Sequence, residues 1–154
     1  MNLCNLPRFF LVLLLCISLH SLKAQKSYAV FNHVAIDVRN LDKSVAFYTS
    51  LLHFQHIPSP WPKRRISWFN IGGHTQLHII EADVNEKIIV PENLHFCFSI
   101  RSMDAFIARL KSGHIDYDDG NGNKSAINVR PDGIKQIYLR DPDGYMIEIN
   151  DQVF

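Results

Sequence analysis

Cysteine is scarce in this chain of 154 residues, which contains three, and only Cys97 lies beyond the first two dozen residues. A single thiol cannot form an intramolecular disulfide, so the domain after that point is not a disulfide-stabilised scaffold. An excess of one charge is also missing, because 16 Lys and Arg face 15 Asp and Glu. This balance argues against a nucleic-acid partner, which a strongly basic surface would indicate. Walker-type and GxGxxG phosphate loops are absent from the sequence as well.

The N-terminus differs in composition from the rest of the chain. Arg8 precedes an apolar run over 9–19 (FFLVLLLCISL), and the small residue Ala24 follows. This order predicts a secretory signal peptide over 1–24 that is cleaved near Ala24. The run is shorter than the roughly 20 residues that span a bilayer, although a membrane anchor or a buried N-terminal helix stays open as an alternative. We therefore expect a periplasmic or extracellular protein that keeps no stable membrane contact after cleavage.

Residues 25–154 then form the mature chain. The hydrophobic fraction of 47% fits one globular domain and is too high for a disordered chain. A domain of about 130 residues buries most of its apolar surface without the help of disulfides.

An internal repeat organises this domain. The segment 33–42 (HVAIDVRNLD) aligns without gaps with 95–104 (HFCFSIRSMD), and a weaker match relates 73–80 to 143–150. Each copy predicts a strand, a helix and three further strands, which together form a βαβββ module. Two such modules in one chain predict an α+β fold.

The expected elements follow from local patterns. Apolar residues at helical spacing predict helices over 42–52 and 104–111. Asp42 and Asp104 are placed to cap the free backbone N–H groups of these helices. The expected strands are 29–38, 54–59, 64–71 and 75–82 in the first module, and 93–100, 114–118, 134–140 and 145–150 in the second.

Four strands share a polar pattern that points to a metal site. Because strand side chains alternate between two faces, each of these strands has one apolar face and one face with a metal-competent residue. These residues are His33, His78, His95 and Glu148, at equivalent positions of the two copies. Each one alone would be an ordinary structural or surface residue, but the shared pattern predicts a common site. Three imidazoles and a carboxylate suit one divalent metal ion, without distinguishing Zn, Ni, Co, Mn and Fe.

The domain resembles the vicinal oxygen chelate superfamily, which is also called the glyoxalase/bleomycin-resistance/dioxygenase fold. The resemblance is carried by FNHVAIDVRNLDKSVAFYTSLL, TQLHII, NLHFCFSIRSMDAFIARL and IYLRDPDGYMIEIND and covers nearly all of 29–151. It implies that the two modules form a cup-shaped, eight-stranded mixed sheet with helices on its outer face. It also implies that the four ligand positions are filled by His33, His78, His95 and Glu148. Members chelate a substrate through two neighbouring oxygens, and the metal acts as a Lewis acid.

The resemblance implies a metal-dependent isomerase or lyase, similar to lactoylglutathione lyase, acting on a small substrate with adjacent oxygens. The metal would polarise a carbonyl or hydroxyl while a base moves a proton on the adjacent carbon. Glu148 and Asp37 are the candidate catalytic residues. Asp37 and Ala82 stand where glyoxalase I has residues that serve glutathione, so this chain departs from that enzyme.

The sequence also leaves other functions and the assembly of the protein open. Two His and one carboxylate are also the minimal site of a non-haem Fe(II) dioxygenase. Some members of the superfamily bind antibiotics without catalysis, but these usually lack the ligands that this chain keeps. A homodimer is open as well, because dimers are common in the superfamily, although one chain holds both modules.

Several further residues are expected near the site or at the surface. Those expected to flank the site are Trp61, Arg64, Arg65, Trp68, Arg130 and Lys135, and an exposed rim with aromatic packing is an equally good interpretation. Cys97 is expected to be a small buried residue. Four histidines at helix ends or turns are expected at the surface: His53, His56, His74 and His114.

Overall fold

The structure is a computed structural model that describes residues 29–83, 91 and 93–153. The chain divides into two units, 1–31 and 32–154, and every helix and strand named below belongs to the second. The predicted signal peptide lies outside the described residues. Within the described ranges, no helix is long and apolar enough to cross a membrane.

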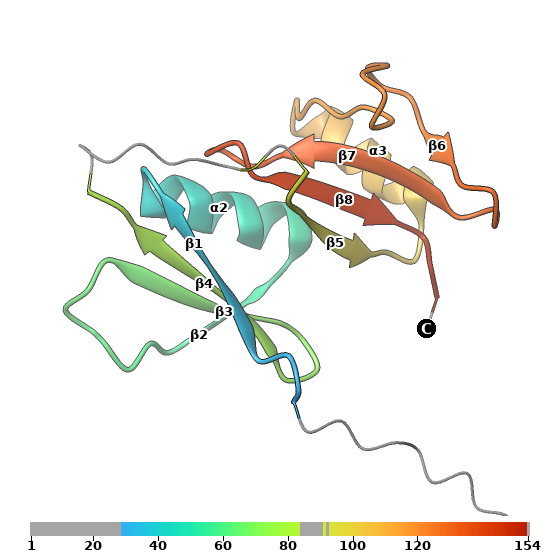
Figure 1. Cartoon of the computed structure of the whole chain (residues 1–154). Coiled ribbons are helices and arrows are strands. Elements are labelled where there is room, and N and C mark those ends of the chain that lie inside the picture. The colour runs from blue at the N-terminus through green and yellow to red at the C-terminus, as the bar shows by residue number, and fades with distance from the viewer. Residues whose placement is uncertain (1–28, 84–90, 92, 154) are drawn as a thin grey trace, which may run out of the picture. The chain divides into compact units, whose positions relative to one another are not determined.

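The first module is a four-stranded sheet with one helix, and its elements are labelled in Figure 1. Its elements are β1 (His33–Val38), α2 (Leu41–Leu52), β2 (Gln55–Ile57), β3 (Ile66–Gly72) and β4 (Thr75–Glu81). The strand order is β1-β4-β3-β2, with β1 parallel to β4 and the other neighbours antiparallel. The tight turn between β3 and β4 uses Gly72 and Gly73 at φ 126° and 54°, which residues with side chains rarely adopt.

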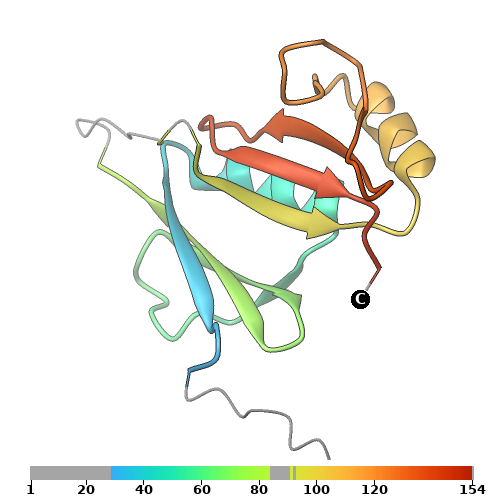
Figure 2. The same cartoon turned by 45° about the vertical axis from the view of Figure 1, so that its right-hand side comes forward.

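The second module repeats this arrangement. Its elements are β5 (His95–Ser99), α3 (Met103–Ser112), β6 (Asn128–Val129), β7 (Lys135–Arg140) and β8 (Met146–Asn150). The strand order is β5-β8-β7-β6, with β5 parallel to β8 and the other neighbours antiparallel. Figure 2 shows β5, β8 and β7 side by side in this sheet.

The predicted α+β class with two βαβββ modules is confirmed. The expected eight-stranded mixed sheet is present as two four-stranded mixed sheets, and no strand pairing joins these sheets in the described part of the chain. The strand predicted at 114–118 is wrong, because Asp118 makes only isolated bridges there, to Lys124 and Tyr138. The corresponding strand is the short β6, which follows a glycine-rich loop and pairs with β7.

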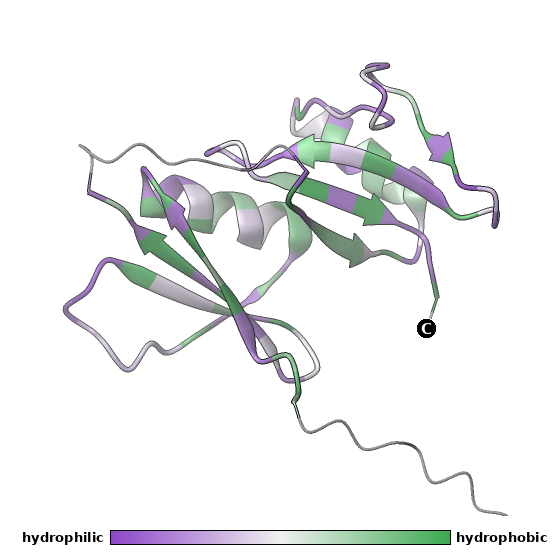
Figure 3. Cartoon of the chain, in the orientation of Figure 1, coloured by the Kyte–Doolittle hydropathy of each residue, from purple (hydrophilic) through white to green (hydrophobic). Residues whose placement is uncertain are grey.

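Apolar side chains of both modules form the core. Buried residues recur every three or four positions along α2 and α3, so each helix buries one face. The predicted apolar positions of α3, which are Phe106, Ile107 and Leu110, are all buried. Figure 3 shows hydrophobic and hydrophilic residues alternating along strands of both sheets. The alternation follows from the strand geometry, which turns successive side chains to opposite faces.

The helix caps differ from the prediction. Asn40 precedes α2, and its side chain accepts a hydrogen bond of 2.9 Å from a backbone N–H of the first turn. Ser102 caps α3 in the same way at 3.2 Å. The predicted caps, Asp42 and Asp104, lie inside the first turns instead. Their charges still favour the positive helix end, but the preceding residue has the extended backbone that a cap needs.

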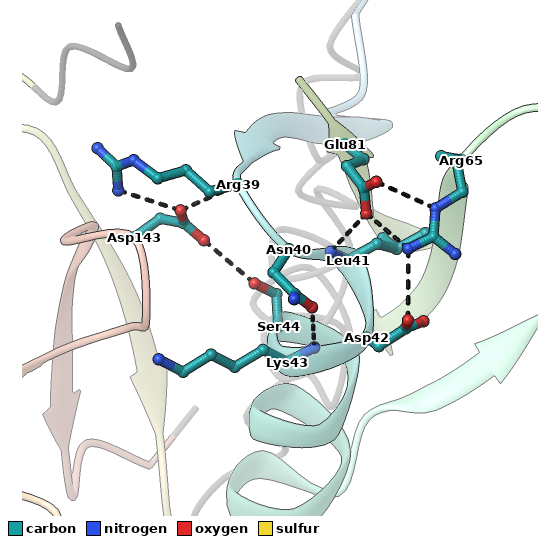
Figure 4. Close-up of polar contacts among 9 residues, drawn as sticks. All are labelled: Arg39, Asn40, Leu41, Asp42, Lys43, Ser44, Arg65, Glu81 and Asp143. Atoms are coloured by element: carbon teal, nitrogen blue, oxygen red, sulfur yellow. Dashed lines mark hydrogen bonds and ion pairs between the residues drawn. The ribbon is translucent and has the colours of Figure 1, made fainter. Parts of the chain in front are cut away.

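The N-terminus of α2 receives carboxylates from both modules (Figure 4). Glu81, at the end of β4, accepts a hydrogen bond from the backbone N–H of Leu41 at 2.9 Å. Asp143, in the turn before β8, accepts one from the backbone N–H of Arg39 at 2.9 Å and one from Ser44 Oγ at 3.2 Å. Negative side chains are favourable at this end of a helix. The helix end therefore links the two modules.

A buried hydrogen bond adds to this link. Tyr48 Oη donates to Asp141 Oδ2 at 2.9 Å, and both residues are buried. The other oxygen of Asp141 accepts hydrogen bonds from the backbone N–H groups of Asp143 and Tyr145, each at 2.9 Å. Burial, reinforced by the charge of Asp141, raises the pKa of Tyr48, so its hydroxyl keeps the proton that it donates. One carboxylate thus holds α2 and the turn into β8 together.

We expect Tyr48→Phe to lower the free energy of unfolding by about 1–3 kcal/mol, because it leaves a buried oxygen of Asp141 without its donor. Urea unfolding followed by circular dichroism measures this difference. Tyr145→Phe is the matched control, since Tyr145 Oη also donates across the modules, at 3.1 Å, but to the backbone oxygen of the exposed Asp37. Water can replace that hydroxyl, so the control variant should lose less free energy of unfolding than Tyr48→Phe. Equal losses in the two variants would contradict this account.

Candidate functional site

Strand register places the four predicted ligands at equivalent positions of the two modules. His33 on β1 and His78 on β4 lie two register positions apart on parallel neighbouring strands. His95 on β5 and Glu148 on β8 have the same relation in the second module. An even separation in register puts both side chains of a pair on one face of the sheet. We refer to His33 and His78 as the first pair, and to His95 and Glu148 as the second pair.

The two imidazoles of the first pair are stacked, with ring centroids 4.3 Å apart and an interplanar angle of 16°. His33 Nδ1 donates a hydrogen bond to Asn32 Oδ1 at 2.7 Å. His78 Nε2 donates one to Gln76 Oε1 at 2.8 Å. Each neutral ring therefore has its lone pair on the other nitrogen. Burial of His78, reinforced by the neighbouring His33, lowers the pKa of His78 and favours the neutral form that binds metals.

The second pair brings a nitrogen and an oxygen close together. His95 Nε2 lies 3.3 Å from Glu148 Oε2. His95 Nδ1 donates a hydrogen bond to the backbone oxygen of Asn93 at 3.3 Å, which puts the lone pair of a neutral ring on Nε2. Two lone pairs that face each other at this distance repel unless a proton or a metal ion lies between them. The geometry of this pair therefore suits a cation.

The structure brings the predicted ligands together only as these two pairs. Among residues 29–83, 91 and 93–153, no group of three or more His, Cys, Asp and Glu side chains could hold a metal ion. The two pairs belong to different sheets, which are not joined by strand pairing in these ranges. The donor types fit a divalent cation, but each pair alone supplies two ligands. A four-ligand site therefore requires the two pairs to meet.

The repeat also places an aromatic residue opposite the second ligand of each pair. Trp68 on β3 is the register partner of His78, and Tyr138 on β7 is the register partner of Glu148. Trp68 stacks on His78 with ring centroids 3.9 Å apart and an interplanar angle of 5°. Tyr138 Oη instead donates a hydrogen bond to Glu148 Oε2 at 3.0 Å. Partial burial, reinforced by Glu148, raises the pKa of Tyr138 to about 12, so the phenol is a hydrogen-bond donor at neutral pH.

A cavity of about 580 Å³ lies beside the second pair. Hydrogen-bonding groups dominate its walls, which suits a small hydrophilic ligand. Sequence reasoning missed Tyr138 here, although Gln136, Tyr138 and Arg140 alternate along the predicted strand 134–140 and so share one face. The cavity is lined by Asn93, His95, residues 118–122, Asn128, Gln136, Tyr138, Arg140 and Met146.

One carboxylate organises the loop that borders this cavity. Asp119 is only 8% exposed and accepts a hydrogen bond from Asn123 Nδ2 at 2.8 Å. It also accepts hydrogen bonds from the backbone N–H groups of Asn121 and Asn123, at 2.9 and 3.0 Å. These bonds, that of the Asn123 side chain above all, lower the pKa of Asp119 to about 2. The cavity border is therefore held in place by bonds within the loop itself.

The residues predicted to flank the site divide into three groups. Trp61 packs edge-to-face on Trp68, with ring centroids 5.5 Å apart, and so adjoins the first pair. Arg65 and Arg130 are engaged in ion pairs with nearby carboxylates, at 2.7 and 2.6 Å, and serve local structure. The remaining two, Arg64 and Lys135, are exposed.

Three further predictions concern single residues and the other histidines. Cys97 is exposed and not buried as predicted, and partial burial of its sulfur, with the charge of Glu148, raises its pKa to about 12. Asp37 lies on the exposed face of β1, four residues and about 13 Å along the strand from His33, and belongs to neither pair. The histidines predicted at the surface are indeed exposed, namely His53, His56, His74 and His114.

Comparisons with known proteins agree with this fold. A model of the Glyoxalase/Bleomycin resistance protein/Dioxygenase superfamily matches residues 30–149. The chain is 33% identical over 121 residues to Metallothiol transferase FosB of Shouchella clausii (strain KSM-K16), with 77% of each protein covered. It is 31% identical over 123 residues to Glyoxylase I 4 of Arabidopsis thaliana, which covers 77% of this chain and 68% of that protein. The solved structure of Oxidase ChaP-H2 matches with a TM-score of 0.68 at 20% identity, over 83% of this chain and 97% of that chain.

We expect the stabilising effect of Asp119 to disappear in acid. Its pKa in the folded state, about 2, lies below the usual value of about 3.9, so the carboxylate stabilises the fold above about pH 4. This contribution is lost as the pH falls toward about 2. The difference in free energy of unfolding between wild type and Asp119→Asn should therefore shrink between about pH 5 and about pH 2. The exposed Asp116, changed to Asn, is the control, and a difference for Asp119→Asn that does not vary with pH would refute this assignment.

Proposed function

Because the chain belongs to the Glyoxalase/Bleomycin resistance protein/Dioxygenase superfamily, we propose that it is a metal-dependent enzyme that acts on a small substrate with two neighbouring oxygen atoms. The proposed reaction is of the isomerase or lyase type. The observation that carries this proposal is the equivalent register of the two pairs, which puts two metal-competent side chains on one face of each sheet. The side chains at these matching positions are buried or are oriented by hydrogen bonds. This favours a functional role for the two pairs over a structural one.

The proposed cofactor is one divalent metal ion held by His33, His78, His95 and Glu148. Zn, Ni, Co, Mn and Fe(II) all accept this set of nitrogen and oxygen donors. When bound, the ion supplies Lewis-acid chemistry that polarises a substrate oxygen. The hydrogen bonds on the other ring nitrogens orient the imidazoles for this role.

We infer that a homodimer completes the site, with the first pair of one copy facing the second pair of its partner. Among the strands of the described residues, β1 and β5 each lie at an edge of their sheet. Unpaired strand edges are suited to pairing with another chain. A twofold dimer would form two equivalent sites, because each copy supplies one pair to each.

Glu148 is the proposed base of the reaction, a role that requires its carboxylate to leave the metal ion. Two of its contacts, His95 and Tyr138, line the cavity that is suited to a hydrophilic substrate. Glu148 would take a proton from the hydroxyl-bearing carbon beside the substrate carbonyl and return it to the carbonyl carbon, while the hydroxyl proton passes to the former carbonyl oxygen, so that no proton is gained or lost overall. Asp37 is the second candidate, and its separation of about 13 Å from His33 along β1 makes it the weaker one.

A second candidate function is the transfer of a thiol to a small substrate. Two relatives, at 33% and 30% identity, are named metallothiol transferases. Thiol transfer consumes a thiol and Fe(II) oxygenation consumes dioxygen, whereas proton relocation consumes neither. Measuring thiol and dioxygen during turnover therefore separates the three reactions.

Elemental analysis of the purified protein, prepared without chelators, is expected to find about one divalent ion per chain. The His33→Ala/His95→Ala variant removes one ligand from each pair and should lose the metal. The exposed His74 and His114 provide a matched control, since the variant with Ala at both positions should keep it. A wild-type protein that takes up none of the five ions on reconstitution would overturn the proposed function.

Mixing two defective variants tests where the site forms. One variant lacks the first pair (His33→Ala/His78→Ala), and the other lacks the second (His95→Ala/Glu148→Ala). If the site forms between copies, each mixed dimer contains one intact site, and metal binding returns after mixing. If the site forms within one chain, mixing does not restore metal binding. The proposed dimeric site is then wrong, although the proposed metal-dependent function stands.

Glu148→Gln is expected to lower turnover by about 10²- to 10⁴-fold, because it removes the proposed base and also a charged metal ligand, so metal content is measured in the same sample. Deuterium incorporation beside the carbonyl of 2-hydroxy and 2-oxo compounds, followed by nuclear magnetic resonance with and without an added thiol, measures the reaction. Asp37→Asn is the comparison and should change turnover by less than about threefold. The opposite ranking of the two variants would transfer the role of base to Asp37.

We also propose that residues 1–24 are a signal peptide and that the mature protein is periplasmic or extracellular. The order of Arg8, an apolar run and Ala24 supports this proposal. Mass spectrometry of the exported protein should find Gln25 as its first residue. A full-length chain that stays in the membrane would favour the anchor instead.

A further inference from the structure

A chain of hydrogen bonds across β7 and β8 holds the Glu148 carboxylate. Gln136 Nε2 donates to Tyr138 Oη at 3.1 Å, and Tyr138 Oη donates to Glu148 Oε2 at 3.0 Å. Asn150 Nδ2 donates to the other oxygen, Glu148 Oε1, at 3.2 Å. Tyr138 and Asn150 thus place a donor on each oxygen and restrict the rotation of the carboxylate, and the Cys97 thiol is a further hydrogen-bond neighbour of Glu148. Glu148 Oε2 is also the atom that lies 3.3 Å from His95 Nε2.

The ring of Tyr138 is confined by the loop that borders the cavity. A Cβ atom at Gly120 would lie 2.7 Å from Tyr138 Cε2 and 2.9 Å from Tyr138 Cδ2, which is closer than van der Waals contact allows. The backbone of Asp118 is hydrogen-bonded to that of Tyr138 in both directions, at 2.9 and 2.8 Å. These backbone bonds therefore fix the loop and the residue that carries the ring relative to each other. Because Gly120 has no side chain, the loop leaves the space that the ring needs.

We propose that Tyr138 is a positioning residue for Glu148, and that Gly120 sets the place of the Tyr138 ring. This inference rests on the proposed function, in which Glu148 is a metal ligand. The module repeat supports it, because Trp68 has the same register relation to His78 as Tyr138 has to Glu148. An imidazole is held by stacking on a ring face, whereas a carboxylate needs a hydrogen-bond donor. Each module thus has the kind of aromatic residue that its second ligand requires.

Two glycine variants separate the contact with Tyr138 from backbone strain. Gly120 and Gly122 have nearly the same positive φ, 83° and 88°, so an Ala at either position meets the same unfavourable φ. Only at Gly120 does the new Cβ meet Tyr138, because nothing lies within 4 Å of a Cβ at Gly122. Tyr138→Phe removes the hydroxyl and keeps the ring. Circular dichroism and thermal unfolding establish that each variant is folded.

Titration of the metal-free protein with Co²⁺ alone, followed by its visible absorption bands, reports both affinity and coordination. Tyr138→Phe and Gly120→Ala are each expected to weaken Co²⁺ binding by about 10- to 100-fold and to alter the bands. Gly122→Ala should stay within about threefold of wild type. In the Tyr138→Phe background, Gly120→Ala should have no further effect, because the hydroxyl that it displaces is already gone.

Three results would overturn the inference. Wild-type affinity and bands in Tyr138→Phe would exclude Tyr138 as a positioning residue. Equal losses in the two glycine variants would reduce the role of Gly120 to backbone strain. Additive losses in the double variant would mean that Gly120 does not act through the Tyr138 hydroxyl.

Failure of the proposed function is distinguishable from failure of this inference. If the wild-type protein binds no Co²⁺ or other divalent ion, the metal-dependent function is wrong. Crystal structures of the metal-free glycine variants then decide the inference. The Tyr138 hydroxyl should lie beyond hydrogen-bond distance of Glu148 in Gly120→Ala and within it in Gly122→Ala. A hydroxyl that stays bonded to Glu148 in Gly120→Ala would overturn the inference by itself.

Discussion

The buried carboxylate of Asp141 is the polar group on which the arrangement of the modules depends. It accepts hydrogen bonds from Tyr48 of α2 and from two backbone N–H groups of the turn that leads into β8. A buried carboxylate that lost these donors would carry a large desolvation cost, so helix and turn stay together. Because β8 follows this turn directly, the same carboxylate ties the strand that carries Glu148 to α2 of the first module.

The internal repeat determines where the residues of the candidate site lie. Each module brings two metal-competent residues to one sheet face, and each adds an aromatic residue opposite the second of them. The two modules share this strand geometry but surround the second ligand of each pair with different side chains. His78 is stacked between Trp68 and His33, whereas Glu148 is bonded to Tyr138 and Asn150. The second module also carries the polar cavity, so the two halves of the proposed site contribute different surroundings to one metal ion.

Much of the fold could be predicted because its signals are local. The apolar alternation of strands and the helical spacing of 104–111 survive in the structure almost unchanged. The strand at 114–118 was wrong because strand formation there depends on hydrogen-bond partners in β7, which no local pattern reveals. The helix caps were displaced by two residues because Asn40 and Asp42 are both good cap residues, and only the backbone conformation chooses between them. Tyr138 was missed since an aromatic residue in a strand ordinarily indicates core packing.

By itself the sequence determined the two modules, the face on which each polar residue lies and the identity of the four candidate ligands, because side-chain alternation is a property of a single strand. The tertiary structure decided how those residues are grouped. Register and sheet order, which depend on contacts between segments distant in the chain, join His33 to His78 and His95 to Glu148 but leave the two pairs on separate sheets. The same long-range pairing put Tyr138 beside Glu148 and Gly120 against its ring, since neither neighbour lies within reach along the sequence.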